Sequence, residues 1–128
     1  MSLNEPTSAI IGAAITVHRS LGPGLLESAY RACLAHELRK LGLLVETEKP
    51  IPVVYDGVNL ECGFRADLLV ERRVVVECKA KEKLHPVDKA QVLSHLRLRG
   101  VQVGPLINFH ELVVKDGIHR IVNNYQDE

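Results

Sequence analysis

Two carboxylates and an ammonium group are placed where a β-hairpin would bring them together. Asp67 lies in one aliphatic run, and Glu77 and Lys79 lie in the next. The charged residues 71–73 separate the two runs, a pattern typical of a hairpin. If these three residues form the connection, Asp67 is opposite Glu77, and the two-residue repeat of a strand puts Lys79 on the same face. A two-residue connection would shift the register and separate the three groups.

These three residue types suit one kind of chemistry. Two neighbouring carboxylates form an oxygen-only pocket that suits Mg²⁺ or Mn²⁺. Such an ion can polarise a phosphoryl oxygen and lower the pKa of a bound water. A lysine beside it can orient that water or stabilise charge on the phosphate. These three residues therefore indicate phosphodiester hydrolysis. The simpler alternative is a structural ion pair between Glu and Lys at a solvated strand end.

The elements that must position these residues can be predicted from the apolar pattern. The continuous aliphatic triplets Leu68–Val70 and Val74–Val76 indicate strands that are covered on both faces, as in α/β sheets. We therefore expect an α/β fold with a central mixed β-sheet flanked by helices. Helices are predicted at 6–20, 25–41 and 86–99, strands at 44–48, 52–55, 60–70, 74–79 and 103–109, a terminal hairpin at 112–114 and 118–122, and a loose polar tail at 123–128.

Short motifs along most of the chain resemble a known family. Asp67, followed after nine residues by Glu77-Cys78-Lys79, resembles the signature of the PD-(D/E)XK nuclease superfamily. The string Gly24–Tyr30 has the form Gly-x-x-Glu-x-x-Tyr and resembles the GxxExxY proteins of that superfamily. Five further strings are similar to that family in the same order: Val17-His18, Leu21–Gly24, Phe64–Asp67, Ala90-Gln91 and Leu106–Phe109. The resemblance covers about residues 9–109.

The resemblance implies both a fold and an activity. The fold would be the restriction-endonuclease-like αβββαβ core, and the activity a Mg²⁺-dependent nuclease that hydrolyses DNA or RNA. Asp67 and Glu77 would hold the metal, and Lys79 would act on the water or the phosphate. Glu27 would complete the metal shell, and Gln91 would help to orient it.

Several helical residues have a structural interpretation beside the functional one. Glu27 in a first helical turn is favourable to the helix dipole whether or not it binds metal. Tyr30 either hydrogen-bonds near the site or fills the core. His18 lies beside an apolar stripe and is expected to be structural. Gln91-x-x-x-His95 matches a Gln-x-x-x-Tyr pattern of RecB-like relatives except at the histidine, so the role of His95 stays open.

Length and charge limit the possible partners. The chain has 128 residues, which predicts one domain over 1–128, and its formal net charge is zero. Residues 65–99 hold nine Lys or Arg and five Asp or Glu, a local charge of +4 that suits a nucleic-acid partner. A homodimer that encloses the substrate is conceivable from the small size. The alternative function is a non-catalytic module that binds nucleic acid or protein on a nuclease-like fold.

The remaining composition excludes other classes of site. Three cysteines without a Cys-x-x-Cys pair indicate neither a zinc site nor a disulfide framework. We expect Cys62 and Cys78 to be small core residues. The sequence shows no secretory or membrane-spanning apolar stretch, so a cytoplasmic location without membrane association is expected.

Overall fold

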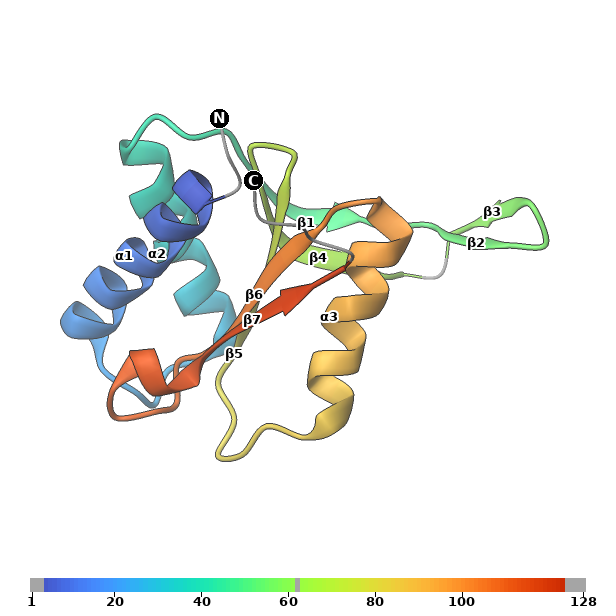
Figure 1. Cartoon of the computed structure of the whole chain (residues 1–128). Helices are drawn as coiled ribbons and strands as arrows, with labels where there is room; N and C mark the ends of the chain where they lie inside the picture. The colour runs from blue at the N-terminus through green and yellow to red at the C-terminus, as the bar shows by residue number, and fades with distance from the viewer. Residues whose placement is uncertain (1–3, 62, 124–128) are drawn as a thin grey trace.

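A five-stranded mixed sheet forms the centre of the computed structural model, which describes residues 4–61 and 63–123 (Figure 1). Its strands lie in the order β1-β4-β5-β6-β7, with β5 and β6 parallel and the other neighbours antiparallel. Their bounds are β1 Val45–Pro50, β4 Arg65–Val70, β5 Val74–Lys79, β6 Val103–Asn108 and β7 Ile118–Val122. A separate two-stranded ribbon, β2 (Val53–Tyr55) and β3 (Val58–Leu60), extends away from the sheet.

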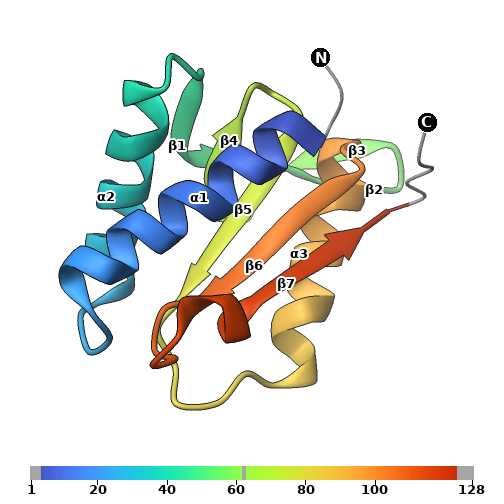
Figure 2. The same cartoon turned by 60° about the vertical axis from the view of Figure 1, so that its left-hand side comes forward.

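Helices cover both faces of the sheet. Helices α1 (Asn4–Leu21) and α2 (Glu27–Lys40) lie on one face, and α3 (Pro86–Arg99) lies on the other and connects the parallel strands β5 and β6 (Figure 2). This arrangement confirms the predicted α/β class with a central mixed sheet. No described helix is both long and apolar enough to cross a membrane.

Two apolar cores correspond to the two faces. The first lies between the sheet and helices α1 and α2, and it includes Leu68, Val76 and Cys78. The second lies between the sheet and α3, and it includes Leu69 and Val75. Adjacent residues of one strand thus enter opposite cores, which explains the continuous aliphatic runs. Cys78 is fully buried as predicted, and Cys62 lies outside the described residues.

Helix α3 has the bounds that the sequence predicts. Pro86 begins it, where the missing N–H of proline costs nothing. The carboxylate of Asp88 accepts a hydrogen bond of 2.7 Å from the N–H of His85. Gly100 ends the helix with φ 74°, a left-handed conformation that glycine adopts without strain. These bounds fix the face that α3 presents to the sheet.

Three parts of the chain differ from prediction. The expected strand 60–70 is divided into β3 and β4, and Gly63 between them has φ 76°. The expected hairpin of 112–114 and 118–122 is wrong, because residues 114–117 form a short 3₁₀ helix (η1, Val114–Gly117) and β7 pairs with β6 instead. The tail is not loose at Asn123, whose N–H donates to the carbonyl of Gln102 at 2.7 Å. Residues 124–128 lie outside the described chain.

Candidate active site

The β4–β5 hairpin has the register that the sequence predicts. Residues 71–73 connect the strands, and Leu68 pairs with Val76. Asp67 and Glu77 are the next residues on the two strands, and the regular backbone pairing stops before them. The acidic residues therefore mark the point where β4 and β5 separate.

The carboxylates replace backbone carbonyls as acceptors at this point. The N–H of Cys78 donates to Asp67 Oδ2 at 2.8 Å, and the N–H of Asp67 donates to Glu77 Oε1 at 3.3 Å. Each acid is thus tied to the opposite strand. Burial and the nearby negative charge of Glu77 raise the pKa of Asp67 to about 6. The two hydrogen bonds hold the carboxylates of Asp67 and Glu77 next to each other across the strands.

The two acids nevertheless contact different helices. Asp67 Oδ1 lies 3.4 Å from Nη1 of Arg31 on α2, whereas Glu77 Oε1 lies 3.3 Å from Nδ1 of His95 on α3. Strict alternation predicts that both acids face one side of the sheet, but Ala66 packs in the α3-side core together with Leu69, so the alternation is interrupted at Asp67. Asp67 therefore faces the α2 side of the sheet and Glu77 faces the α3 side.

Lys79 follows Glu77 on the same strand and is half-buried. Its positive charge partly offsets the rise in the pKa of Asp67 that burial and Glu77 cause, and it adds to the lowering of the pKa of Asp88. Within the described chain the ammonium has no ion pair within 4.0 Å. The sequence predicts all three groups on one face of the sheet; this is wrong, because Asp67 turns toward α2 and Glu77 toward α3. Asp67 and Glu77 are adjacent across the two strands, and the role of Lys79 beside them stays a prediction.

His95 supports Glu77 from helix α3. The imidazole is buried, with Nδ1 on Glu77 Oε1 and its ring 5.1 Å from the ring of Phe64 in an edge-to-face contact. Its Nε2 is buried without a partner among the described residues. An unpaired N–H donor would be costly, so we assign the proton to Nδ1, which then donates to Glu77.

The comparisons with known proteins identify the family. Residues 4–121 match the family model described as the PD-(D/E)XK nuclease superfamily. The chain belongs to this superfamily. The mixed sheet with helices on both faces agrees with its restriction-endonuclease-like fold. Searches of curated proteins and of solved structures found no match.

PD-(D/E)XK nucleases generally use divalent metal ions, and the acids of this chain suit such an ion. Mg²⁺ is commonly bound through one or two carboxylates together with water and substrate phosphates. Asp67 and Glu77 supply two, and their mutual repulsion would be relieved by a cation. Within residues 4–61 and 63–123, no three His, Cys, Asp or Glu side chains are grouped to hold a metal. The described residues therefore provide two adjacent carboxylates, and their role as metal ligands remains a prediction.

Glu27 lies on helix α2, one turn before Arg31. It is exposed in the first turn of α2 and lines an open hollow of about 480 Å³ with Arg31 and Ala80. Its charge contributes to raising the pKa of Cys78, after burial and the charges of Asp67 and Glu77. Glu27 is thus near the end of β5, and its role as a metal ligand remains a prediction.

Gln91 lies on α3, one helical turn before His95. It is exposed, whereas Asp88 and His95 on either side of it along the helix are buried. Spacings of three and four residues put these side chains on neighbouring positions of one helix face. Gln91 is therefore at the solvent edge of the face that carries His95, and its orienting role remains a prediction.

Two other motif residues prove to be structural. Tyr30 is fully buried, stacks on Phe109 with ring centroids 4.5 Å apart, and donates a hydrogen bond of 2.6 Å to the carbonyl of Gly22. Its hydroxyl also accepts the N–H of Leu25, so it fixes the break before α2. His18 is buried with Nε2 2.7 Å from the carbonyl oxygen of Glu111, as expected of a structural histidine.

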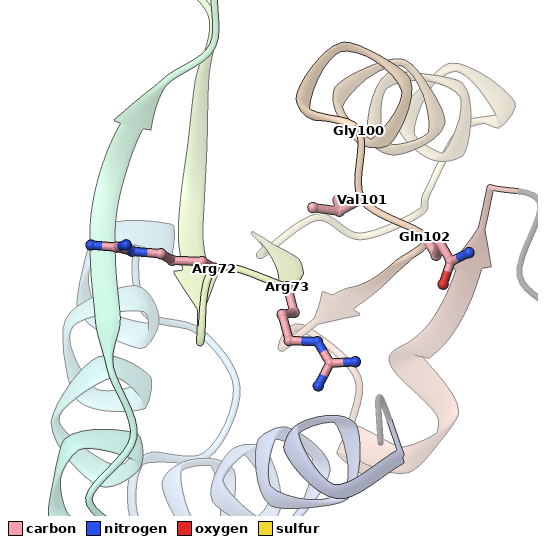
Figure 3. A pocket seen from close by; sticks show the side chains of 5 residues that line it. All are labelled: Arg72, Arg73, Gly100, Val101 and Gln102. Atoms are coloured by element: carbon pink, nitrogen blue, oxygen red, sulfur yellow. The ribbon is translucent and has the colours of Figure 1, made fainter. Parts of the chain in front are cut away.

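A hollow of about 260 Å³ lies at the other end of the β4–β5 hairpin (Figure 3). It is lined by Arg72, Arg73, Gly100, Val101 and Gln102. Figure 3 shows that the two arginine side chains point in different directions. None of the described residues that line the hollow carries a carboxylate, the group that a divalent ion such as Mg²⁺ prefers.

Sequence reasoning missed two residues at the site, Arg31 and Glu48. Arg31 Nη2 lies 3.1 Å from Glu48 Oε1 while its Nη1 faces Asp67. The i, i+4 spacing of Glu27 and Arg31 signals that both lie on one helix face. No sequence pattern signals Glu48, because its position depends on a local distortion of β1, where it has φ 50°.

Proposed function

We propose that this protein is a Mg²⁺- or Mn²⁺-dependent nuclease of the GxxExxY type, acting on DNA or RNA, and that its 128 residues function as one domain. The observation that supports the proposal best is the cluster at the opening of the β4–β5 hairpin. Two acids lie there within electrostatic reach of each other and of a lysine that has no ion pair in the described chain. Membership of the nuclease superfamily supports phosphodiester hydrolysis as the proposed reaction class.

Each residue has a role that follows from its surroundings. Asp67 and Glu77 would hold the divalent ion, which supplies charge that polarises a phosphoryl oxygen. The backbone of Cys78 and the ring of His95 keep the two carboxylates in place. Lys79 would donate to the phosphate or orient the attacking water. Glu27 and Gln91 are proposed to border the cluster from α2 and α3.

A basic loop beyond β5 suits the phosphate backbone of the substrate. Lys81, Glu82, Lys83 and His85 line an open hollow of about 630 Å³ between the end of β5 and the start of α3. Lys81 is paired with Asp88 at 2.9 Å, whereas Lys83 is exposed. Contacts from such a loop would be independent of base sequence and sensitive to salt.

Cleavage assays test the proposal directly. Purified protein with Mn²⁺ or Mg²⁺ is incubated with single- and double-stranded DNA and RNA. We expect cleavage that EDTA abolishes and that falls by at least about 100-fold in Asp67→Asn and in Lys79→Ala. Asp67→Asn would weaken binding of the ion, and Lys79→Ala would remove a positive charge at the reacting phosphate. Asp56→Asn and Lys40→Ala are matched controls at exposed positions and should retain full activity. Intact substrates throughout the panel would contradict the proposal.

A second candidate is a binding module without turnover. Arg31 already pairs with Asp67, and the described residues contain no three-ligand metal group, both of which favour this alternative. It predicts nucleic-acid binding that weakens with salt and survives Asp67→Asn. Cleavage that depends on Asp67 would exclude it.

A further inference from the structure

Arg31 connects two acids on neighbouring strands. Its guanidinium lies 3.1 Å from Glu48 on β1 and 3.4 Å from Asp67 on β4. The side chain of Arg31 is 23% exposed and that of Asp67 is 19% exposed, whereas that of Glu48 is 58% exposed. The arginine is thus held more closely by the outer acid than by the inner one.

The backbone around Glu48 is specialised. In the β1–β4 ladder, Thr47 pairs with Leu68 and Lys49 pairs with Ala66, but the intervening Glu48 and Asp67 do not form a regular pair. Glu48 has φ 50°, a left-handed conformation that a residue with a Cβ rarely adopts. Backbone strain of this kind is frequent at functional sites. Glu48 on β1, Asp67 on β4 and Glu77 on β5 therefore lie next to one another across three adjacent strands. The regular backbone pairing of β4 with both neighbours is broken at this position.

The two oxygens of Asp67 have different partners. Oδ2 accepts a short bond of 2.8 Å from the N–H of Cys78, whereas Oδ1 faces Arg31 at 3.4 Å, longer than a strong charge-assisted hydrogen bond. Oδ1 is therefore the oxygen that an arriving cation would take more easily. If it does, Arg31 retains Glu48 as a partner.

We propose that Arg31 is the internal counter-ion of the metal site. Without metal, its guanidinium neutralises Asp67; when a divalent ion binds Asp67 in its place, Arg31 stays paired with Glu48. The inference rests on the proposed metal site. In this role Arg31 lowers the affinity for the ion, and Glu48 raises it by drawing Arg31 away from Asp67. Arg31 is a positioning residue, since it acts through Asp67.

Mn²⁺ binding without substrate tests this inference. Binding is measured by calorimetry at low ionic strength and by the shift in melting temperature. Arg31→Gln should bind Mn²⁺ about tenfold more tightly than the wild type, because a competing positive charge is removed. Lys40→Gln makes the same change of charge on the same helix at an exposed position and should leave the affinity unchanged. Equal affinities of Arg31→Gln and Lys40→Gln would overturn the inference.

The role of Glu48 is tested by a double-mutant cycle. Glu48→Gln should weaken Mn²⁺ binding several-fold in the wild type, because Arg31 then pairs with Asp67 alone. In the Arg31→Gln background the same substitution should have no effect. If the charge of Glu48 instead acted directly on the ion, Glu48→Gln would weaken Mn²⁺ binding equally in both backgrounds. That result would overturn the proposed role of Arg31 between Glu48 and the ion.

Two further measurements distinguish a failure of the Arg31 inference from a failure of the proposed metal site or of folding. If Arg31→Gln does not fold, as judged by circular dichroism, Arg31→Lys replaces it, because lysine keeps the charge but cannot bridge the two acids with one planar group. Its Mn²⁺ affinity should exceed that of the wild type. If wild-type protein does not bind Mn²⁺, or Asp67→Ala binds it equally well, the proposed function fails together with this inference. If only the Arg31 effect is missing, the proposed function stands alone.

Discussion

The two halves of the β4–β5 hairpin are built differently. Near the connection, Leu68–Val70 and Val74–Val76 form a regular ladder whose side chains are all buried and apolar. Beyond Leu68 and Val76, the carboxylates of Asp67 and Glu77 accept the backbone N–H groups of the opposite strand. The first half holds the sheet together, whereas the second half separates the strands around charged groups.

This difference between the two halves explains how a stable sheet can contain a charged cluster. Burial of the aliphatic half stabilises the hairpin without any polar group, so the register does not depend on the acids. The acids can then remain close together in spite of their repulsion, because the ladder beside them fixes the two strands. Three substitutions test this division, from the largest expected effect to the smallest.

Leu68→Ala should have the largest effect on stability. Leu68 is fully buried in the core beneath α1 and α2, so its truncation leaves a cavity and should lower the free energy of unfolding by about 2–5 kcal/mol. Urea denaturation followed by circular dichroism measures the change. Val54→Ala on the exposed β2–β3 ribbon is the control, expected to stay within about 0.5 kcal/mol of the wild type. A similar loss in both variants would show that the aliphatic half is not the stabilising part.

Asp67→Asn should have an intermediate effect that depends on pH. The pKa of Asp67 is about 6 in the folded protein, above its ordinary value of 3.8. The folded state therefore binds this proton more tightly, and wild-type stability falls relative to Asp67→Asn as pH rises from about 4 to 6. After a discount for solvent screening, we expect a change of about 1–2 kcal/mol in the difference between the two proteins.

Urea denaturation at pH 4, 5, 6 and 7 measures that difference. Asp56→Asn at the exposed ribbon turn serves as the control for the loss of one carboxylate. Mn²⁺ at pH 7 should restore part of the wild-type stability and leave Asp67→Asn unchanged. A difference that does not vary with pH would contradict the raised pKa of Asp67, which burial and the charge of Glu77 cause.

Glu46→Gln should have the smallest effect. Glu46 pairs with Lys49 at 2.7 Å and with Arg72 of the hairpin connection at 3.9 Å, both in partly exposed surroundings. Exposed ion pairs contribute little because solvent and salt screen them. We expect no measurable change in the urea midpoint, at low or high salt. A clear loss would show that charges also stabilise the connection end of the hairpin.

The parts of the fold that were predictable have local signals. The apolar triplets on either side of Glu71–Arg73 fix the hairpin register, and Pro86 and Gly100 mark the ends of α3. That register places Asp67 opposite Glu77, but it does not predict that the two carboxylates contact different helices. These predictions succeed because the interacting residues are close in sequence.

The parts that were missed depend on distant partners. Residues 112–114 have the composition of a strand, but β7 pairs with β6 rather than with them. The predicted hairpin therefore does not form. The contact of Asp67 with Arg31 requires the packing of α2 against the sheet, and the unpaired position of Glu48 opposite Asp67, with φ 50°, has no local sequence signal. No local pattern contains that information.

The connectivity of β5 suggests an order in which the cluster assembles during folding. Asp67 and Glu77 belong to one short hairpin, and hairpins of this kind form within microseconds. The parallel pairing of β5 with β6 must wait for the α3 crossover, since loop closure delays distant contacts. We therefore expect the two acids to meet early in refolding, before His95 and Arg31 arrive to support them.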